Sequence, residues 1–290
     1  MLVNATQMLQ SAVKGHYAIP AFNTNNLEWA ASILDAAEES QSPVIIQCTS
    51  GAAKWQVSFK TVADLVKDLV EAKNITVPVA MHLDHGTYED VFKCIDAGFT
   101  SVMYDGSHEK TFELNLERTA EIVKIAHAKG ISVEAEVGGI GGVEDGVASM
   151  GELADPQQCK AIADTGVDFL ACGIGNIHGL YPEDWEGLSF DRLQEIKDLV
   201  GDLPLVLHGG TGIPTDMVQK AIGMGIAKIN VNTDLQVAFA KATRGYVEAG
   251  KDLQGKGYDP RKLLKPGRDA IVVRAKELIH DFGSEGKGWA

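Results

Sequence analysis

Eight short apolar runs, separated by segments with helical periodicity, constrain the fold of this 290-residue chain more than any other feature. Most runs are continuously apolar rather than alternating, which is typical of strands covered on both faces of a parallel sheet. Between them apolar residues recur every three or four positions, as in Leu27 to Glu39 and Thr111 to Lys129, which predicts amphipathic helices. Eight such alternations predict an α/β fold, a (β/α)8 TIM barrel. The predicted strands are 17–22, 43–48, 78–83, 101–104, 132–136, 168–172, 204–207 and 227–231.

An open, doubly wound sheet is the alternative, but its dinucleotide-binding fingerprint is missing. Gly173 and Gly175 are followed by Asn176, Ile177 and His178, without the third glycine at its required position. A barrel takes about 250 residues. We therefore expect one barrel domain over 1–290, with a C-terminal helical extension from about residue 250 that ends in a helix over 268–282.

Composition excludes several classes of protein. The chain has 26 Lys and Arg against 40 Asp and Glu, and its formal charge of −14 excludes a nucleic-acid binder driven by bulk charge. No stretch approaches the roughly 20 apolar residues that span a membrane. No secretory signal is visible, so the expected location is cytoplasmic. The four cysteines form no C-x-x-C pair and are expected to be buried thiols.

Polar side chains capable of chemistry follow nearly every predicted strand at its carboxyl end. Barrel enzymes place their active sites at this end, because the loops that follow the strands meet there. For any single Asn or Thr the alternative is a residue that merely marks where a strand leaves the core. These residues are Asn23, Thr49, Ser50, Asp84, His85, Asp105, Glu136, His178, His208, Asn230 and Asn232.

Three histidines predict a metal site that is assembled across the barrel. His85, His178 and His208 close or follow three different strands, so the fold brings together residues up to 123 positions apart. Three imidazoles that leave one open position are typical of a catalytic zinc, which acts as a Lewis acid. His16, His108, His127 and His280 are expected to be core or surface groups. For His82 we favour a structural role over the orientation of a ligand.

Carboxylates near these histidines suggest proton transfer. Asp84 is either an acceptor for a histidine or a proton carrier, and the sequence does not separate these roles. Glu134 and Glu136 share one face of a strand, and Glu144 follows four of the five glycines in a glycine-rich loop over 138–146. That loop is either a lid that carries an acid or a solvated surface loop.

Two glycine-bearing stretches, 173–179 and 209–212, suit phosphate. The second precedes Pro214 and a predicted helix, whose N-terminus favours an anion. Thr233 and Gln236 form a capping-box pattern that explains Thr233 without a ligand. A basic cluster near the C-terminus either binds a second phosphate or is surface charge, and its members are Arg261, Lys262, Lys265 and Arg268.

Six segments in combination resemble the class II, metal-dependent fructose-1,6-bisphosphate aldolases, especially those of Gram-positive bacteria. The resemblance covers nearly the whole chain and implies a zinc-dependent barrel, a homodimer or homotetramer, that cleaves the ketose bisphosphate into dihydroxyacetone phosphate and glyceraldehyde 3-phosphate. Tagatose-bisphosphate aldolases share most of the pattern and are the alternative. The segments are HLDHG, EAEVGGIGGVEDG, GIGNIHGLY, LVLHGGTGIP, KINVNTDLQ and YDPRKLLKPGRDA.

The resemblance also implies residue roles. Zinc is bound by His85, His178 and His208, while Asp105 and Glu136 match positions that hold a displaced or second metal ion. Asp84 exchanges a proton at the C4 hydroxyl, Glu144 carries the proton at C3, and Asn230 hydrogen-bonds the enediolate. The phosphate cradle matches Gly179, Gly209, Thr211, Asn232 and Thr233, and further substrate contacts match Asn23 and Thr49.

Two more expectations follow from the resemblance. Arg261 resembles an arginine that reaches from a neighbouring subunit to the other phosphate, and a monovalent cation, Na⁺ or K⁺, binds near Gly179 and Gly209. Some members carry lysine directly after the HG-x-Y motif, whereas here Tyr181 is followed by Pro182. The cradle is then expected to depend on backbone amides and the cation.

Two rival interpretations remain open from sequence. Lys228 lies on the same strand face as Asn230 and is either a Schiff-base amine or a barrel-interior group paired with an acid. The second rival is a catalytically silent sugar-phosphate sensor or surface adhesin.

Overall fold

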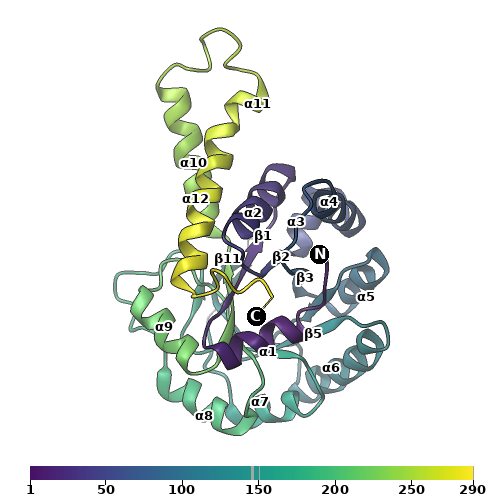
Figure 1. Cartoon of the computed structure of the whole chain (residues 1–290). Coiled ribbons are helices and arrows are strands. Elements are labelled where there is room, and N and C mark those ends of the chain that lie inside the picture. Colours follow the sequence, from purple (N-terminus) through teal and green to yellow (C-terminus); the bar gives the residue numbers. More distant parts are fainter. Residues whose placement is uncertain (145–146, 150, 290) are drawn as a thin grey trace.

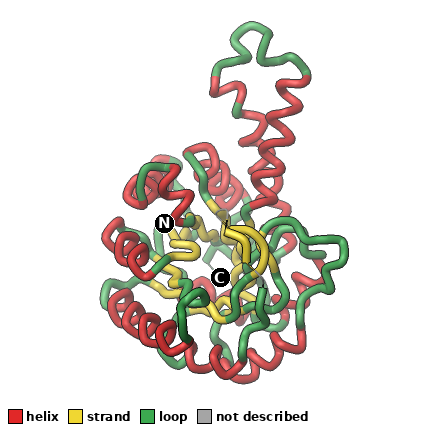
Figure 2. The backbone as a smooth tube through the Cα atoms, turned by 180° about the vertical axis from the view of Figure 1, so that it is seen from behind, coloured by secondary structure: helices red, strands yellow, loops and turns green. Residues whose placement is uncertain are grey.

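The computed structural model shows a closed barrel of eight parallel strands surrounded by helices (Figure 1, Figure 2). It describes residues 1–144, 147–149 and 151–289, with the backbone alone described for 143–144 and 147–149. Pairing of the first strand with the last, Ile19 opposite Lys228 and Ala21 opposite Asn230, closes the cylinder. The barrel strands are β1 (Ile19–Asn23), β2 (Val44–Cys48), β3 (Val79–Gly86), β4 (Ser101–Tyr104), β5 (Ser132–Val137), β8 (Phe169–Cys172), β10 (Leu205–Leu207) and β11 (Ile226–Val231).

The predicted (β/α)8 barrel is confirmed, and each predicted run overlaps one barrel strand. The strands are almost entirely buried, as their continuous apolar runs predicted. The four cysteines are buried thiols, and none of them forms a disulfide bond. The helices outside the barrel are α2 (Leu27–Glu39), α3 (Ser50–Trp55), α4 (Phe59–Ala72), α5 (Tyr88–Ala97), α6 (Phe112–His127), α7 (Pro156–Ala163), α8 (Phe190–Val200) and α9 (Thr215–Gly223).

Side-chain caps determine where many of these helices begin. The Asn26 side chain accepts a hydrogen bond from the backbone N–H of Trp29 at 3.0 Å, and α2 starts at the next residue. Thr87 caps α5 in the same way through the N–H of Asp90, at 3.2 Å. Each cap satisfies a backbone donor that the first turn leaves free, so the helix begins soon after the strand leaves the barrel.

The barrel interior is apolar at its amino end and polar at its carboxyl end. Helix α1 (Thr6–Gly15) covers the amino end, and its buried Leu9 and Ala12 belong to the same apolar cluster as Ile19 and Phe169 of the strands. A larger apolar cluster fills the space between the strands and the outer helices. Because apolar side chains fill the amino end of the barrel, polar groups can converge only at the carboxyl end.

A buried ion pair lies in the middle of the barrel. The Lys228 ammonium donates to Glu134 Oε2 at 2.8 Å, and His82 Nε2 lies 3.1 Å from the same oxygen. All three side chains are fully buried. The Nδ1 atom of His82 lies 2.8 Å from the Ser101 hydroxyl, so each of its ring nitrogens faces a polar group of the barrel interior. The interpretations of Lys228 as a group paired with an acid and of His82 as a structural residue agree with these contacts.

Two further elements depart from a plain barrel. Strands β6 (Gly141–Glu144), β7 (Val147–Ser149) and β9 (Ile177–His178) form a small separate sheet, where the sequence predicted only a glycine-rich loop. The pairing places Gly142 opposite His178, and a Cβ at Gly142 would lie 2.3 Å from the His178 carbonyl oxygen. Glycine at this position permits the close backbone approach on which the sheet depends.

A helical arm projects from the barrel (Figure 1). It consists of α10 (Thr233–Glu248), the short α11 (Pro260–Leu263) and α12 (Lys265–Asp281), which returns along α10 and packs on α2. The extension expected from about residue 250 thus begins earlier, because α10 runs without interruption from the last strand into the arm. No helix in the described ranges is long and apolar enough to cross a membrane.

We expect Lys228→Met to lower the free energy of unfolding by about 3 kcal/mol, because it leaves the buried Glu134 carboxylate without its cation. Urea denaturation followed by circular dichroism measures the change. The control is Lys276→Met, which removes an exposed pair with Glu39 and should cost less than about 1 kcal/mol. Equal effects of the two substitutions would contradict the assignment of a structural role to the buried pair.

Candidate active site

A polar cavity of about 240 Å³ opens at the carboxyl end of the barrel. Its lining comes from β1, β3 and β11, from the segments after β8 and β10, and from the first turn of α10. Every lining residue except Gln236 was predicted from the sequence as a site residue. The lining residues are Asn23, Asp84, His178, Gly179, Gly209, Thr211, Asn230, Asn232, Thr233 and Gln236.

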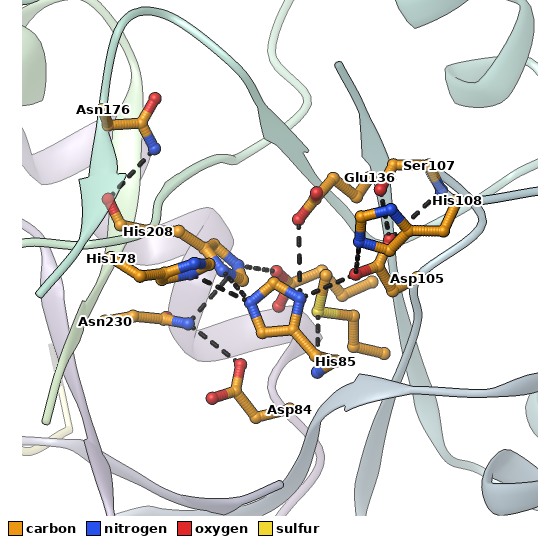
Figure 3. A network of polar contacts seen from close by, with 12 residues as sticks. Asp84, His85, Asp105, Ser107, His108, Glu136, Asn176, His178, His208 and Asn230 are labelled. Carbon is orange, nitrogen blue, oxygen red and sulfur yellow. Dashed lines mark hydrogen bonds and ion pairs between the residues drawn. The ribbon is translucent and has the colours of Figure 1, made fainter. Parts of the chain in front are cut away.

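Three histidine side chains meet at this mouth (Figure 3). His85 Nε2 lies 2.8 Å from His208 Nδ1 and 3.2 Å from His178 Nε2. Each residue offers one ring nitrogen to the cluster, and these nitrogens all lie within 4.8 Å of one another. The predicted convergence of residues from three strand ends is therefore present in the fold.

Carboxylates hold two of the three rings in the orientation that a metal requires. His85 Nδ1 lies 2.8 Å from Asp105 Oδ2, and His208 Nε2 lies 2.9 Å from Glu134 Oε1. A ring N–H that is donated to a carboxylate leaves the other nitrogen as a lone-pair donor. The nitrogens that face one another are thus the ones free to bind a cation, and the donor set fits zinc.

The three imidazoles have different proton affinities. Burial opposes the charged form of His85, but the hydrogen bond to Asp105 and nearby carboxylates raise its pKa well above the usual value. Burial, together with the charge of His85, lowers the pKa of His178 to about 3. Burial also lowers the pKa of His208. Two of the three rings are therefore neutral at physiological pH, as a metal ligand must be.

A second group of possible ligands shares His85. Its ring, Asp105 and Glu136 offer ligand atoms within 4.8 Å of one another. Glu136 Oε2 is buried without a hydrogen-bond partner. Burial and the charge of Asp105 raise the pKa of Glu136 well above its usual value. A cation would relieve both the unpaired oxygen and the repulsion between the two carboxylates.

Asp84 lies next to the histidine cluster and is held by three side-chain amides. Asn23 Nδ2 and Gln47 Nε2 donate to its Oδ2 at 2.8 and 3.0 Å, and Asn230 Nδ2 donates to Oδ1 at 3.1 Å. Burial acts to raise the pKa of Asp84, but the positive charges of His85 and Lys228 and the hydrogen bond from Asn23 hold it below the usual value. The carboxylate is therefore ionised and ready to accept a proton.

Gln47 was missed by sequence reasoning. It is buried in β2, and its amide also donates to Asn23 Oδ1 at 3.0 Å, so it joins two predicted site residues. The available signal was a single polar residue within the otherwise apolar run Val44–Cys48.

The glycine-bearing segments contribute Gly179, Gly209 and Thr211 to the lining of the cavity. Gly179 and Gly209 have φ angles of +92° and +66°, which strongly favour glycine. Thr233 is the first residue of α10, not its cap, because the helix already starts after Asn232, whose side chain makes no capping hydrogen bond. The predicted capping box is therefore wrong. Thr233 and Gln236 both face the cavity instead.

Two of the predicted substrate contacts are not among the described residues that line the cavity. The Thr49 hydroxyl is buried and accepts from the N–H of Ala52 at 3.1 Å, where it caps α3. Arg261 lies on α11 at the far end of the arm (Figure 1), with its guanidinium bound to Asp259. Glu144 ends β6, and its side chain lies outside the described part of the structure.

Together the fold and the site define a barrel enzyme whose mouth combines a histidine cluster that could hold a metal ion, an ionised carboxylate and glycine segments suited to an anion. A family model described as fructose-bisphosphate aldolase class-II matches residues 3–287. The chain is 54% identical over 291 residues to a fructose-bisphosphate aldolase of Streptococcus pyogenes, with 99% of each chain covered. It is 52% identical over 289 residues to one of Mycoplasma pneumoniae, covering 99% of this chain and 100% of that one.

Solved structures agree with this family. The YdjI aldolase from Escherichia coli K12 matches with a TM-score of 0.83 and 35% identity, covering 99% of this chain and 100% of that one. A putative fructose-1,6-bisphosphate aldolase from Coccidioides immitis matches with a TM-score of 0.86 and 31% identity over 98% of each chain. The chain belongs to the class-II fructose-bisphosphate aldolase family. It is thus a lyase, and the comparisons favour fructose bisphosphate over the tagatose alternative.

We expect Zn²⁺ binding at pH 7 to release about one proton, because the raised pKa of His85 keeps that ring protonated until a metal displaces the proton. Affinity should therefore fall as the pH decreases. Calorimetric titration in two buffers of different ionisation enthalpy counts the protons. His108→Ala, which alters an exposed neighbour of Asp105, should leave the count unchanged. Binding without proton release would contradict the protonation state assigned to His85.

Proposed function

We propose that this chain reversibly cleaves fructose 1,6-bisphosphate into dihydroxyacetone phosphate and glyceraldehyde 3-phosphate, using a zinc ion held by His85, His178 and His208. The observation that carries the proposal is the meeting of three imidazole nitrogens beside an ionised Asp84 at the rim of a polar cavity. We propose further that Asp105 and Glu136, with His85, hold a displaced or second metal ion.

The donor set fits zinc, which when bound supplies a Lewis acid that stabilises negative charge developing on the substrate oxygens. The protein contributes the orientation of the three rings. Asp105 and Glu134 accept the outward N–H groups of His85 and His208, so these rings keep their positions whether or not a cation is present.

Proton transfer in the cleavage direction begins at Asp84. Its carboxylate accepts the proton of the C4 hydroxyl as the C3–C4 bond breaks, and the bond electrons pass to C3 as an enediolate. Asn230 donates its amide to that enediolate. Glu144 then delivers a proton to C3, which completes dihydroxyacetone phosphate, and condensation follows the same steps in reverse.

The two phosphates of the substrate occupy different sites in this proposal. One is held by Gly179, Gly209, Thr211, Asn232 and Thr233, with Na⁺ or K⁺ bound beside the glycine backbone. The other is met by Arg261 of a second subunit, which is consistent with the position of α11 far from the cavity of its own chain (Figure 1). The arrangement requires a homodimer or homotetramer. Asn23 and Thr49 supply further substrate contacts, and the enzyme acts in the cytoplasm.

A buried ion pair disfavours the rival mechanism through a Schiff base. The Lys228 ammonium is fully buried, is paired with Glu134, and is not among the residues that line the cavity. A Schiff-base amine must be uncharged and must reach the substrate carbonyl. Lys228 meets neither requirement.

Metal removal tests the proposal directly. After exhaustive chelation, we expect cleavage of fructose 1,6-bisphosphate to fall to the background rate and to return when Zn²⁺ is added. A coupled assay for the triose phosphates measures the rate, and atomic absorption measures the residual metal. Full activity in metal-free protein would rule out the zinc mechanism.

Asp84→Ala tests proton transfer separately from metal binding. We expect kcat to fall by about 10²–10⁴-fold, the usual contribution of a positioned acid or base, while Zn²⁺ still binds at one ion per chain. Asp202→Ala, which alters a fully exposed carboxylate, is the control. Unchanged turnover in Asp84→Ala would exclude this carboxylate as the proton carrier and would favour the sensor interpretation if ligand binding persisted.

A further inference from the structure

The anion-suited wall of the cavity has no cationic side chain. None of the described residues that line it is a lysine or an arginine, and the residue after Tyr181 is Pro182. A phosphate here would be held by backbone N–H groups, hydroxyls and side-chain amides. Such groups bind an anion only when their backbone segments lie at the correct distance from one another.

The two glycine-bearing segments approach each other very closely. A Cβ at Gly209 would lie 1.9 Å from the carbonyl oxygen of Ile177, so the backbones are in direct contact there. Asn176 Nδ2 also donates to the carbonyl of His208 at 3.0 Å, as Figure 3 shows. The segment after β8 and the segment after β10 thus behave as one unit, with Gly179 and Gly209 on its cavity side.

The Tyr181 hydroxyl joins these two segments at a second point. It donates to the carbonyl of Gly209 at 2.9 Å and accepts from the N–H of Ile177 at 3.1 Å. Its ring packs against Trp185 with the centroids 4.1 Å apart, and the indole N–H of Trp185 donates to the carbonyl of Gly175 at 2.8 Å. Burial raises the pKa of Tyr181 to about 12, so the hydroxyl keeps its proton and remains a donor.

We propose that Tyr181 is a positioning residue that sets the spacing of the two glycine segments and so preorganises the phosphate cradle in a chain that lacks a cationic side chain there. This inference rests on the proposed function. Tyr181 does not line the cavity, so it acts through the backbone of Gly209 and Ile177 and not by contact with the phosphate. Binding of the phosphate group, more than the bond-breaking step, is therefore the property that depends on its hydroxyl.

The test is Tyr181→Phe in the zinc-loaded full-length protein. It removes only the hydroxyl and keeps the ring on Trp185. We expect competitive inhibition by dihydroxyacetone phosphate to weaken roughly tenfold, as the loss of one buried hydrogen bond predicts. Inhibition by dihydroxyacetone, which has no phosphate, should stay within about twofold. The KM for fructose 1,6-bisphosphate should rise while kcat changes little.

Tyr246→Phe is the matched control, because it removes another tyrosine hydroxyl that donates to a backbone carbonyl, that of Gly257 in the arm. It should alter neither inhibition constant. Melting temperature and zinc content check that both variants are folded and loaded. Should Tyr181→Phe not fold, Trp185→Leu, which removes the ring support of Tyr181 and keeps its hydroxyl, should weaken inhibition by dihydroxyacetone phosphate selectively.

Two outcomes would overturn the inference. One is an unchanged inhibition constant for dihydroxyacetone phosphate in folded Tyr181→Phe. The other is an equal loss of inhibition by both compounds, which would place the effect at the metal and not at the phosphate. Failure of the proposed function is distinguishable from both, since the wild-type protein itself would then cleave no fructose 1,6-bisphosphate.

Discussion

The Glu134 carboxylate is the interaction on which both the barrel and its mouth depend. One of its oxygens binds the Lys228 ammonium and contacts His82, while the other accepts from His208. A carboxylate buried in the centre of a barrel is tolerated only because opposite charge and hydrogen bonds surround it. The positive charge of Lys228 in turn keeps the pKa of Glu134 well below its usual value against the effect of burial. The group that stabilises the core therefore also fixes the ring of a predicted metal ligand.

Much of the site was predictable because a closed parallel barrel brings together the carboxyl ends of strands that are far apart in the sequence. Once eight runs are interpreted as parallel strands of a closed barrel, the groups at their carboxyl ends must share one mouth. Asp84 and His85 are adjacent in sequence, whereas His178 and His208 reach them only through closure of the sheet. Apolar runs fix the position of a strand to within a few residues, and that precision is sufficient for residues that lie just beyond the strand end.

Contacts that depend on geometry at the scale of one residue were not predictable. Gln47 has no motif, and only the register of β1, β2 and β3 places its amide between Asn23 and Asp84. The capping box at Thr233 failed because α10 begins one residue earlier than the pattern requires. Arg261 is an example of a different kind, since local sequence contains no information on whether the arm turns toward its own barrel or away from it. The role proposed for it rests on the family resemblance.

The pairing of β6 with β9 joins two segments of the chain that lie far apart in the sequence. Gly141 and Gly142 lie opposite Ile177 and His178, so the ribbon that ends at Glu144 is bonded to the strand that carries an imidazole of the cluster. Any displacement of β6 at Gly142 would also displace the backbone of His178, with which Gly142 is paired. The backbone position of β6 and the position of His178 are therefore coupled.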